Sequence, residues 1–211
     1  MLPELFLESL RRLPLIAILR GVTTGEVIEL GKVLHESGFR VIEVPLNSPM
    51  ALQSIQRLRE SLPPDCIVGA GTVLSAMQVR EVFSAGGQII VMPHSDPGVI
   101  RAAKDAGLIC VPGVVTPNEA FAALAAGADA LKLFPAELVS TQVLAAMRSV
   151  LPPSTLMLPV GGITPLSIKD YLNAGASGFG LGSALYRAGQ SLEQTTANAR
   201  RFVKAWQLLA A

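Results

Sequence analysis

A single lysine, Lys132, stands in the middle of the apolar run DALKLFPAE, residues 129–137. A short apolar run closed by a proline predicts a buried strand, and lysine is almost never fully buried without a partner. Burial disfavours the charged ammonium and therefore lowers the pKa of a lysine. The neutral amine is the nucleophile that condenses with a ketone to form a Schiff base. Lys132 is therefore the first candidate for a catalytic residue.

A carboxylate within a second apolar run, Glu43, could serve the same reaction. Side chains alternate along a strand, so Glu43 shares a face with Val41, and Lys132 shares one with Ala130 and Phe134. If both faces point inward, Glu43 could carry the protons that carbinolamine formation and carbon–carbon cleavage require. The alternative is a buried lysine–glutamate ion pair with a purely structural role.

Two further polar residues, Arg20 and Thr72, also follow apolar runs. The same alternation places Arg20 on a face with Ile18 and Thr72 on a face with Ala70. If these faces also point inward, Arg20 and Thr72 are predicted to lie near Lys132 and Glu43. Arg20 would lower the pKa of Lys132 further because like charges repel. Thr72 could bind a carboxylate together with nearby backbone N–H groups. It could also cap the helix expected over residues 75–85, and the two roles are compatible.

Two glycine loops near the end of the sequence indicate a phosphate site. They are VGGITP at 160–165 and GLGSALY at 180–186, one strand-and-helix unit apart. Glycine lets backbone N–H groups approach phosphate oxygens, and Ser183 adds a hydroxyl donor. Either loop alone is a weak signal, but the pair predicts a phosphorylated substrate.

The elements that must position these residues repeat along the chain. Apolar runs typical of strands occur at 15–19, 41–46, 66–70, 88–92, 108–111, 130–134, 156–160 and 178–181. Helix-patterned segments lie between them, and five of these segments end in glycine, the usual left-handed stop. Eight such units without a linker predict an α/β fold, a single (β/α)8 TIM barrel domain over residues 1–211.

An open doubly wound sheet is the alternative on pattern alone. The first fourteen residues predict an extra N-terminal helix that covers the lower end of the barrel. In a barrel of this kind, catalytic residues gather at the carboxyl ends of the strands. Lys132, Glu43, Arg20 and Thr72 all fall at or near such ends, as do the two glycine loops.

Composition excludes several classes of function. Charged residues make up 16% of the chain, against ~25% in typical globular domains, and the net charge is only +1. Without a basic stripe interleaved with aromatic residues, nucleic acid is not an expected partner. The sequence contains no uninterrupted apolar run of ~18 residues, the length that predicts a membrane span. The acidic N-terminal segment does not resemble a signal peptide.

Two isolated cysteines, Cys66 and Cys110, lie in apolar surroundings and are expected to be reduced thiols of a cytoplasmic protein, with a disulfide as the lesser alternative. Two cysteines and two distant histidines do not supply the closely spaced ligands that a zinc site needs. The sequence therefore predicts an enzyme without a metal or cofactor.

Six motifs, in order, resemble a known family. They are IAILRG at 16–21, IEVPLNSP at 42–49, VGAGTVL at 68–74, ALKLFPAE at 130–137, VGGITP at 160–165 and GLGSALYRAGQS at 180–191. The chain resembles the class I 2-keto-3-deoxy-6-phosphosugar-acid aldolases from about residue 14 to residue 206. Two branches of that family act on C4 epimers, the phosphogluconate and phosphogalactonate substrates. The gluconate branch typically carries arginine, threonine and tryptophan where this chain has Asn47, Ser48 and Ala184, so the galactonate branch is the better match.

The resemblance implies a role for each candidate residue. Lys132 would form the Schiff base with the C2 ketone of a phosphorylated 2-keto-3-deoxy sugar acid, and Glu43 would shuttle protons. Arg20 and Thr72 would contact the substrate, with Thr72 near the pyruvate carboxylate. The residues implied at the phosphate end are Gly162, Gly182 and Ser183. Retro-aldol cleavage would yield pyruvate and glyceraldehyde 3-phosphate without a metal, and the resemblance also implies a homotrimer.

One departure and several alternatives remain. Met92 stands where the family usually has a small hydroxyl residue, so the end of the fourth strand is not included in the expected site. The substrate could be the gluconate epimer. The chain could also be a different phosphate-binding barrel enzyme, such as a phosphosugar isomerase or a pyridoxal-phosphate enzyme, or an inactive barrel that only binds sugar phosphates.

Overall fold

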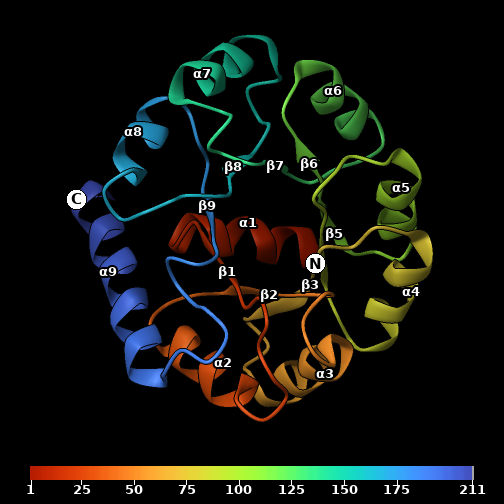
Figure 1. The fold of residues 1–211 in the computed structure, drawn as a ribbon. Coiled ribbons are helices and arrows are strands. Elements are labelled where there is room, and N and C mark those ends of the chain that lie inside the picture. The colour runs from red at the N-terminus through yellow and green to blue at the C-terminus, as the bar shows by residue number, and fades with distance from the viewer. Residues whose placement is uncertain (211) are drawn as a thin grey trace.

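The computed structural model describes residues 1–210, and its parallel strands are curled inside a ring of helices (Figure 1). The strands are β1 (Leu15–Ile18), β2 (Val41–Pro45), β3 (Ile67–Gly71), β4 (Ile89–Val91), β5 (Ile109–Val111), β6 (Gly113–Val114), β7 (Leu131–Leu133), β8 (Met157–Pro159) and β9 (Phe179–Leu181). All eight strand positions expected from the sequence are confirmed. The short strand β6 was not expected.

The strands form two parallel sheets with an α/β arrangement. Six pair in the order β5-β4-β3-β2-β1-β9, and three pair in the order β6-β7-β8. An isolated parallel bridge between Val160 and Gly180 links the end of β8 to β9. Strands β5 and β6 follow one another along the chain and are separated only by Pro112, which has no N–H group to donate to a ladder. The extra strand thus comes from a proline that interrupts one extended segment.

Apart from the N-terminal helix, the helices lie outside the strands (Figure 1). They are α1 (Leu2–Arg12), α2 (Val27–Glu36), α3 (Ala51–Ser61), α4 (Ala76–Ser84), α5 (Pro97–Asp105), α6 (Pro117–Ala125), α7 (Thr141–Val150), α8 (Ile168–Asn173) and α9 (Leu192–Ala210). Their boundaries follow local chemistry. Asp96 accepts hydrogen bonds from Gly98 and Val99 at the start of α5, and Thr116 forms a capping box with Glu119 at the start of α6.

Buried apolar side chains form two clusters, one on each face of the strands. The outer cluster, between strands and helices, includes Leu131 and Leu133 of β7. The inner cluster fills the space enclosed by the strands and includes Val41 and Ala130. A strand buried on both faces reads as a continuous apolar run, which explains why strand positions were readable from the sequence.

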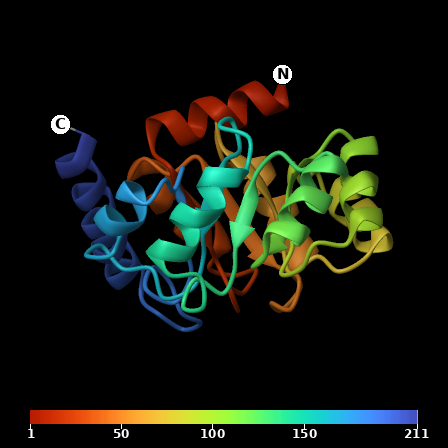
Figure 2. The same ribbon diagram turned by 90° about the horizontal axis from the view of Figure 1, so that it is seen from above.

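Helix α1 lies across one end of the strands, as Figures 1 and 2 show. Its side chains Phe6 and Leu10 are buried in the inner cluster, against residues from the amino ends of several strands, such as Ile16 and Ile67. The same helix exposes Arg11 and Arg12 to solvent. Helix α1 therefore closes the end of the strands opposite to the candidate residues.

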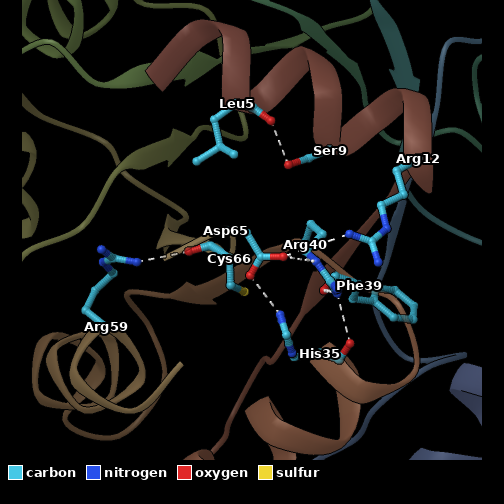
Figure 3. A network of polar contacts seen from close by, with 9 residues as sticks. All are labelled: Leu5, Ser9, Arg12, His35, Phe39, Arg40, Arg59, Asp65 and Cys66. Atoms are coloured by element: carbon cyan, nitrogen blue, oxygen red, sulfur yellow. Dashed lines mark hydrogen bonds and ion pairs between the residues drawn. The ribbon is translucent and has the colours of Figure 1, made fainter. Parts of the chain in front are cut away.

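A polar network built on Asp65 ties this end together (Figure 3). Arg40, only 8% exposed, donates to Asp65 at 2.7 Å and also to the carbonyl oxygens of His35 and Phe39. His35 Nε2 lies 3.0 Å from Asp65 Oδ1, and Arg12 of α1 lies 3.9 Å from Oδ2. Burial raises the pKa of Asp65, but the hydrogen bond from His35 and the charge of Arg40 together outweigh it and lower that pKa.

Asp65→Asn is expected to lower the free energy of unfolding near neutral pH by about 1–2 kcal/mol, because Arg40 loses its only charged acceptor while buried. A lowered carboxyl pKa stabilises the fold above the value of the unfolded state, 3.8, and this contribution is lost as the pH falls through the folded value. The difference between the two proteins should therefore shrink below about pH 4. Urea unfolding at neutral pH and below about pH 4 measures this difference in the free energy of unfolding. The exposed Asp105→Asn is the control. Equal stability of Asp65→Asn and wild type at neutral pH would contradict the prediction.

The two cysteines are both free and buried, which excludes the disulfide alternative. Burial raises the pKa of Cys66 and of Cys110 to about 12, so neither thiol is a ready nucleophile. Within residues 1–210, no helix combines the length and the apolar character needed to cross a membrane.

Candidate active site

Lys132 lies on β7 with its side chain directed to the inside of the strands. Its neighbours Leu131 and Leu133 belong to the outer cluster and Ala130 to the inner one, so the predicted alternation is confirmed. The lysine is only 5% exposed, and its Nζ lies 4.2 Å from the centre of the Phe134 ring. The amine is therefore buried by inward-facing residues of other strands, such as Ile18 and Leu158, while Leu131 and Leu133 face the helices.

Glu43 lies on β2 and is 2% exposed. It shares the inward face with Val41, as expected from the alternation. Gly71 of the neighbouring strand β3 makes room for it, because a Cβ at position 71 would overlap the Glu43 carboxyl group. The Oε2 atom of Glu43 is buried and has no hydrogen-bond partner within the described residues. A buried oxygen left free in this way is available to a ligand.

Lys132 and Glu43 face one small cavity of about 10 Å³, which is otherwise lined by apolar residues such as Ile18 and Leu158. Within residues 1–210, the ion pairs do not include one between Lys132 and Glu43. The two groups therefore share an environment without forming the structural ion pair considered above.

This environment shifts both groups toward their neutral forms. Burial raises the pKa of Glu43 to about 7, although the positive charges of Lys132 and Arg20 and the backbone of Gly71 oppose the rise. Burial lowers the pKa of Lys132; Glu43 opposes this change and Arg20 adds to it. A carboxyl group poised near neutrality and an amine with a depressed pKa are suited to proton transfer and nucleophilic attack, respectively.

Arg20, at the end of β1, lies exposed at the rim of the site. Its guanidinium donates to Asn47 Oδ1 at 2.7 Å and to Thr72 Oγ1 at 3.5 Å. These contacts join the loops that follow β1, β2 and β3. Sequence reasoning noticed Asn47 as a mark of one family branch, but not as the partner that orients Arg20.

Thr72 reaches this cluster by a route that the sequence prediction had wrong. The alternation placed Thr72 on a shared inward face with Val68 and Ala70, but both of these belong to the outer cluster. Strand β3 ends at Gly71, and Thr72 has a φ of 55°, in the left-handed region. This backbone reversal breaks the alternation and turns Thr72 toward Arg20. The capping alternative is also wrong, because Ser75 accepts the hydrogen bond from Gln78 N at the start of α4.

The glycine loops line a cleft of about 950 Å³ above the Lys132 amine. Gly162, Gly182 and Ser183 border it, as do Arg20 and Lys132. Gly161 and Gly162 have φ values of 111° and 62°, which favour glycine over other residues. Arg187 Nε donates to the backbone carbonyl oxygen of Ser183 at 3.1 Å. This contact does not involve the Ser183 hydroxyl group.

A partly buried hydrogen bond connects this cleft to the loop after β1. Tyr186 is 1% exposed, and its hydroxyl donates to Glu26 Oε1 at 2.7 Å. Thr23 N donates to the same oxygen at 3.0 Å. The pairing was not expected from the sequence, because 160 residues separate the two; Tyr186 lies in the second glycine-loop motif, and Glu26 lies in no motif.

Met92 takes no part in the cleft. It is fully buried in the outer cluster, and its sulfur lies 3.8 Å from Cys110 Sγ. The departure from the family pattern therefore lies in the packing between the strand and helix layers, outside the lining of the cleft.

The arrangement combines a buried amine, a buried carboxyl group and a cleft with glycine loops and basic side chains. Within the described residues, no group of three or more His, Cys, Asp or Glu side chains is placed to hold a metal ion. Groups of these types can form a Schiff base with a carbonyl compound and bind an anionic group at some distance from the carbonyl.

Comparison with known families gives one match over most of the chain. The model of the family described as "Aldolase: KDPG and KHG aldolase" matches residues 7–199. The chain is similar to a 2-dehydro-3-deoxy-6-phosphogalactonate aldolase of Escherichia coli, with 44% identity over 93% of this chain and 96% of the relative. A probable 2-dehydro-3-deoxy-6-phosphogalactonate aldolase of Rhizobium meliloti is 45% identical over 84% of each chain.

A relative with a different substrate in its name is more distant. The 2-dehydro-3-deoxy-phosphogluconate aldolase of Haemophilus influenzae is 32% identical over 79% of this chain and 78% of its own. Among solved structures, one described as native KDPGal superposes with a TM-score of 0.93 at 44% identity, covering 94% of this chain and 97% of the other.

Proposed function

The chain belongs to the KDPG and KHG aldolase family, and we propose on this basis that it cleaves 2-dehydro-3-deoxy-6-phosphogalactonate to pyruvate and D-glyceraldehyde 3-phosphate. It is a carbon–carbon lyase of the aldolase type. The observation that carries the mechanism is the shared cavity of Lys132 and Glu43, two buried groups that are not ion-paired and that are both shifted toward their neutral forms.

The reaction begins at Lys132. Its neutral amine attacks the C2 ketone, and loss of water from the carbinolamine leaves an iminium ion. Glu43 transfers the protons of this step, since it faces the same cavity. A base then removes the proton of the C4 hydroxyl, the C3–C4 bond breaks, and its electron pair moves into the iminium to give an enamine. Protonation of the enamine at C3 and hydrolysis release pyruvate and restore the amine.

The remaining site residues bind the two anionic ends of the substrate. Arg20 and Thr72 contact the substrate near the keto acid end, with Thr72 close to the carboxylate. Gly162, Gly182 and Ser183 hold the phosphate. The length of the cleft supports this assignment, because it runs from Lys132 to both glycine loops. The reaction uses no metal or cofactor, since the iminium is itself the electron sink.

The assembly is proposed to be a cytoplasmic homotrimer of one barrel domain over residues 1–211. We infer that the two sheets work as one closed (β/α)8 barrel with the extra helix α1, because only Pro112 separates β5 from β6 and because the bridge from Val160 to Gly180 joins β8 to β9. Resemblance to the family supports the trimer, as do the low charged fraction of 16% and exposed apolar side chains such as Met77 and Phe121.

Borohydride reduction in the presence of pyruvate tests the mechanism. The imine between pyruvate and Lys132 should be reduced to a stable adduct, which peptide mass mapping locates. The same treatment without pyruvate is the control. An adduct on another lysine, or an unmodified Lys132, would rule the proposed nucleophile out.

The choice of epimer has its own test. Pyruvate release is measured with the phosphogalactonate and phosphogluconate substrates under identical conditions, and a higher kcat/KM is expected for the former. This expectation follows the relatives at 44% and 45% identity rather than the one at 32%. A preference for the phosphogluconate epimer would assign the chain to the other branch while leaving the aldolase chemistry intact.

A further inference from the structure

One acidic side chain, Glu137, lies in the cleft among basic ones. The cleft is lined by two arginines, Arg20 and Arg187, and by the Lys132 amine, and Glu137 is the single carboxylate on its wall within the described chain. The mechanism above does not use it. Glu137 follows β7 by four residues, so the strand that carries the nucleophile also delivers this carboxylate.

Glu137 rests directly on the glycine loop after β8. A Cβ at Gly161 would overlap Glu137 Oε2, and a Cβ at Gly162 would lie 3.1 Å from Oε1. The carboxylate thus fills the space that the missing side chains leave. Gly162 of this loop is proposed to receive the substrate phosphate. The negatively charged carboxylate of Glu137 therefore stands beside the expected position of the phosphate group.

The carboxylate has no counter-charge, although its backbone is well held. Within residues 1–210, no ion pair involves Glu137. Ala136 N donates to the Val160 carbonyl oxygen at 2.9 Å, and the Tyr171 hydroxyl lies 2.9 Å from the Ala136 carbonyl oxygen and 3.2 Å from that of Val139. These bonds hold the segment against the glycine loop, and the side chain of Glu137 is exposed in the cleft.

We propose that Glu137 is a specificity-determining residue that weakens the binding of the phosphate group at the glycine loop. The proposal rests on the proposed function, because it takes the Gly162 loop as the phosphate site. Coulomb repulsion between the carboxylate and a phosphate dianion opposes the attraction of the two arginines, Arg20 and Arg187. Glu137 therefore sets the affinity of the phosphate end below the value that the glycines and basic residues alone would give.

Weaker phosphate binding has a use in this reaction. Tight binding that is equal in the ground state and the transition state lowers KM without raising kcat. The phosphorylated aldehyde must also leave the cleft after cleavage, and an internal carboxylate on the vacated loop favours its departure. Glu137→Gln should therefore lower KM for the phosphorylated ligand and leave kcat equal or reduced.

The test measures binding of inorganic phosphate by titration calorimetry at pH 8 and low ionic strength. Glu137→Gln and Glu137→Ala are both expected to bind phosphate about fivefold more tightly than wild type, and the difference should shrink at high salt because exposed charges are screened. The alanine variant removes the charge without adding an amide donor. Glu81→Gln, which changes the same charge on exposed α4, should leave the affinity unchanged. KM for glyceraldehyde 3-phosphate in the condensation with pyruvate should fall in parallel.

Several outcomes would overturn the proposal. They are equal or weaker phosphate binding by both Glu137 variants, a fivefold gain in Glu81→Gln as well, and a wild type and variants that all fail to bind phosphate. A rise in KM for glyceraldehyde 3-phosphate in the variants would also overturn it, because it would make Glu137 a favourable contact to the substrate. Phosphate binding needs no turnover, so failure of the aldolase reaction itself is detected separately, by the absence of a pyruvate adduct on Lys132.

Discussion

Replacing Lys132 with methionine is expected to reduce retro-aldol turnover by at least about 10⁴-fold, because the reaction loses its nucleophile and with it the iminium electron sink. Methionine has a similar length and no charge, so it fits a side-chain position that is only 5% exposed. Removing a buried amine eliminates its desolvation penalty, and the variant should remain folded. Pyruvate release in a coupled assay measures the loss, and thermal unfolding measures the stability.

The control for this variant is Lys169→Met, which removes an exposed lysine on α8 and should leave kcat unchanged. A Lys132→Met protein that keeps a tenth of the wild-type activity, while trapping pyruvate with borohydride at another site, would contradict the assignment. A folded, inactive variant that no longer traps pyruvate would agree with it.

Glu43→Gln is expected to lower kcat/KM by about 10²–10⁴-fold, the usual range for the loss of a positioned acid–base group. Glutamine retains the size of the side chain beside Gly71 and cannot exchange a proton. The pH profile gives a second reading. Since burial raises the pKa of Glu43 to about 7, the ionised base is lost as the pH falls through 7, and wild-type kcat/KM should decline on that side. The kcat/KM of the Glu43→Gln variant should not show this decline as the pH falls through 7.

The sign of the stability change distinguishes a catalytic role from a structural one. A carboxyl group with a raised pKa binds more protons in the folded state than in the unfolded state between pH 4.5 and 7. The folded state is therefore destabilised as the pH rises through this range, and Glu43→Gln removes that penalty. Near pH 8 the variant should unfold at a temperature no lower than the wild type, as should the control Glu81→Gln. A strongly destabilised and still active Glu43→Gln would show that Glu43 serves packing rather than proton transfer.

Much of the fold could be predicted from the sequence because its strands are buried on both faces. Each strand then reads as a short apolar run, and the alternation of side chains also fixed the inward direction of Lys132 and Glu43 correctly. This reasoning fails where the backbone leaves the strand conformation. The face of Ala70, which Thr72 was expected to share, points outward, and Thr72 reaches the site only because its left-handed backbone lies outside the two-residue repeat.

Other features depend on contacts that a linear pattern does not contain. The split of β5 and β6 at Pro112 follows from a single missing donor in an otherwise apolar segment. The hydrogen bond between Tyr186 and Glu26 joins opposite ends of the chain. Glu137 was present in the motif that carries Lys132, but only the position of the glycine loop shows that its carboxylate stands at the phosphate end.

Gly71 makes the proposed proton carrier, Glu43, dependent on a residue with no side chain. A screen that scores each position by its own functional group would treat position 71 as free to vary. Yet even the smallest addition there would occupy the volume of the Glu43 carboxyl group and displace it. Glu43 can keep its position only while residue 71 is glycine. A library designed to alter substrate range should therefore hold both positions constant. Enzymes of this kind can lose their base through a change that leaves every acidic residue in place.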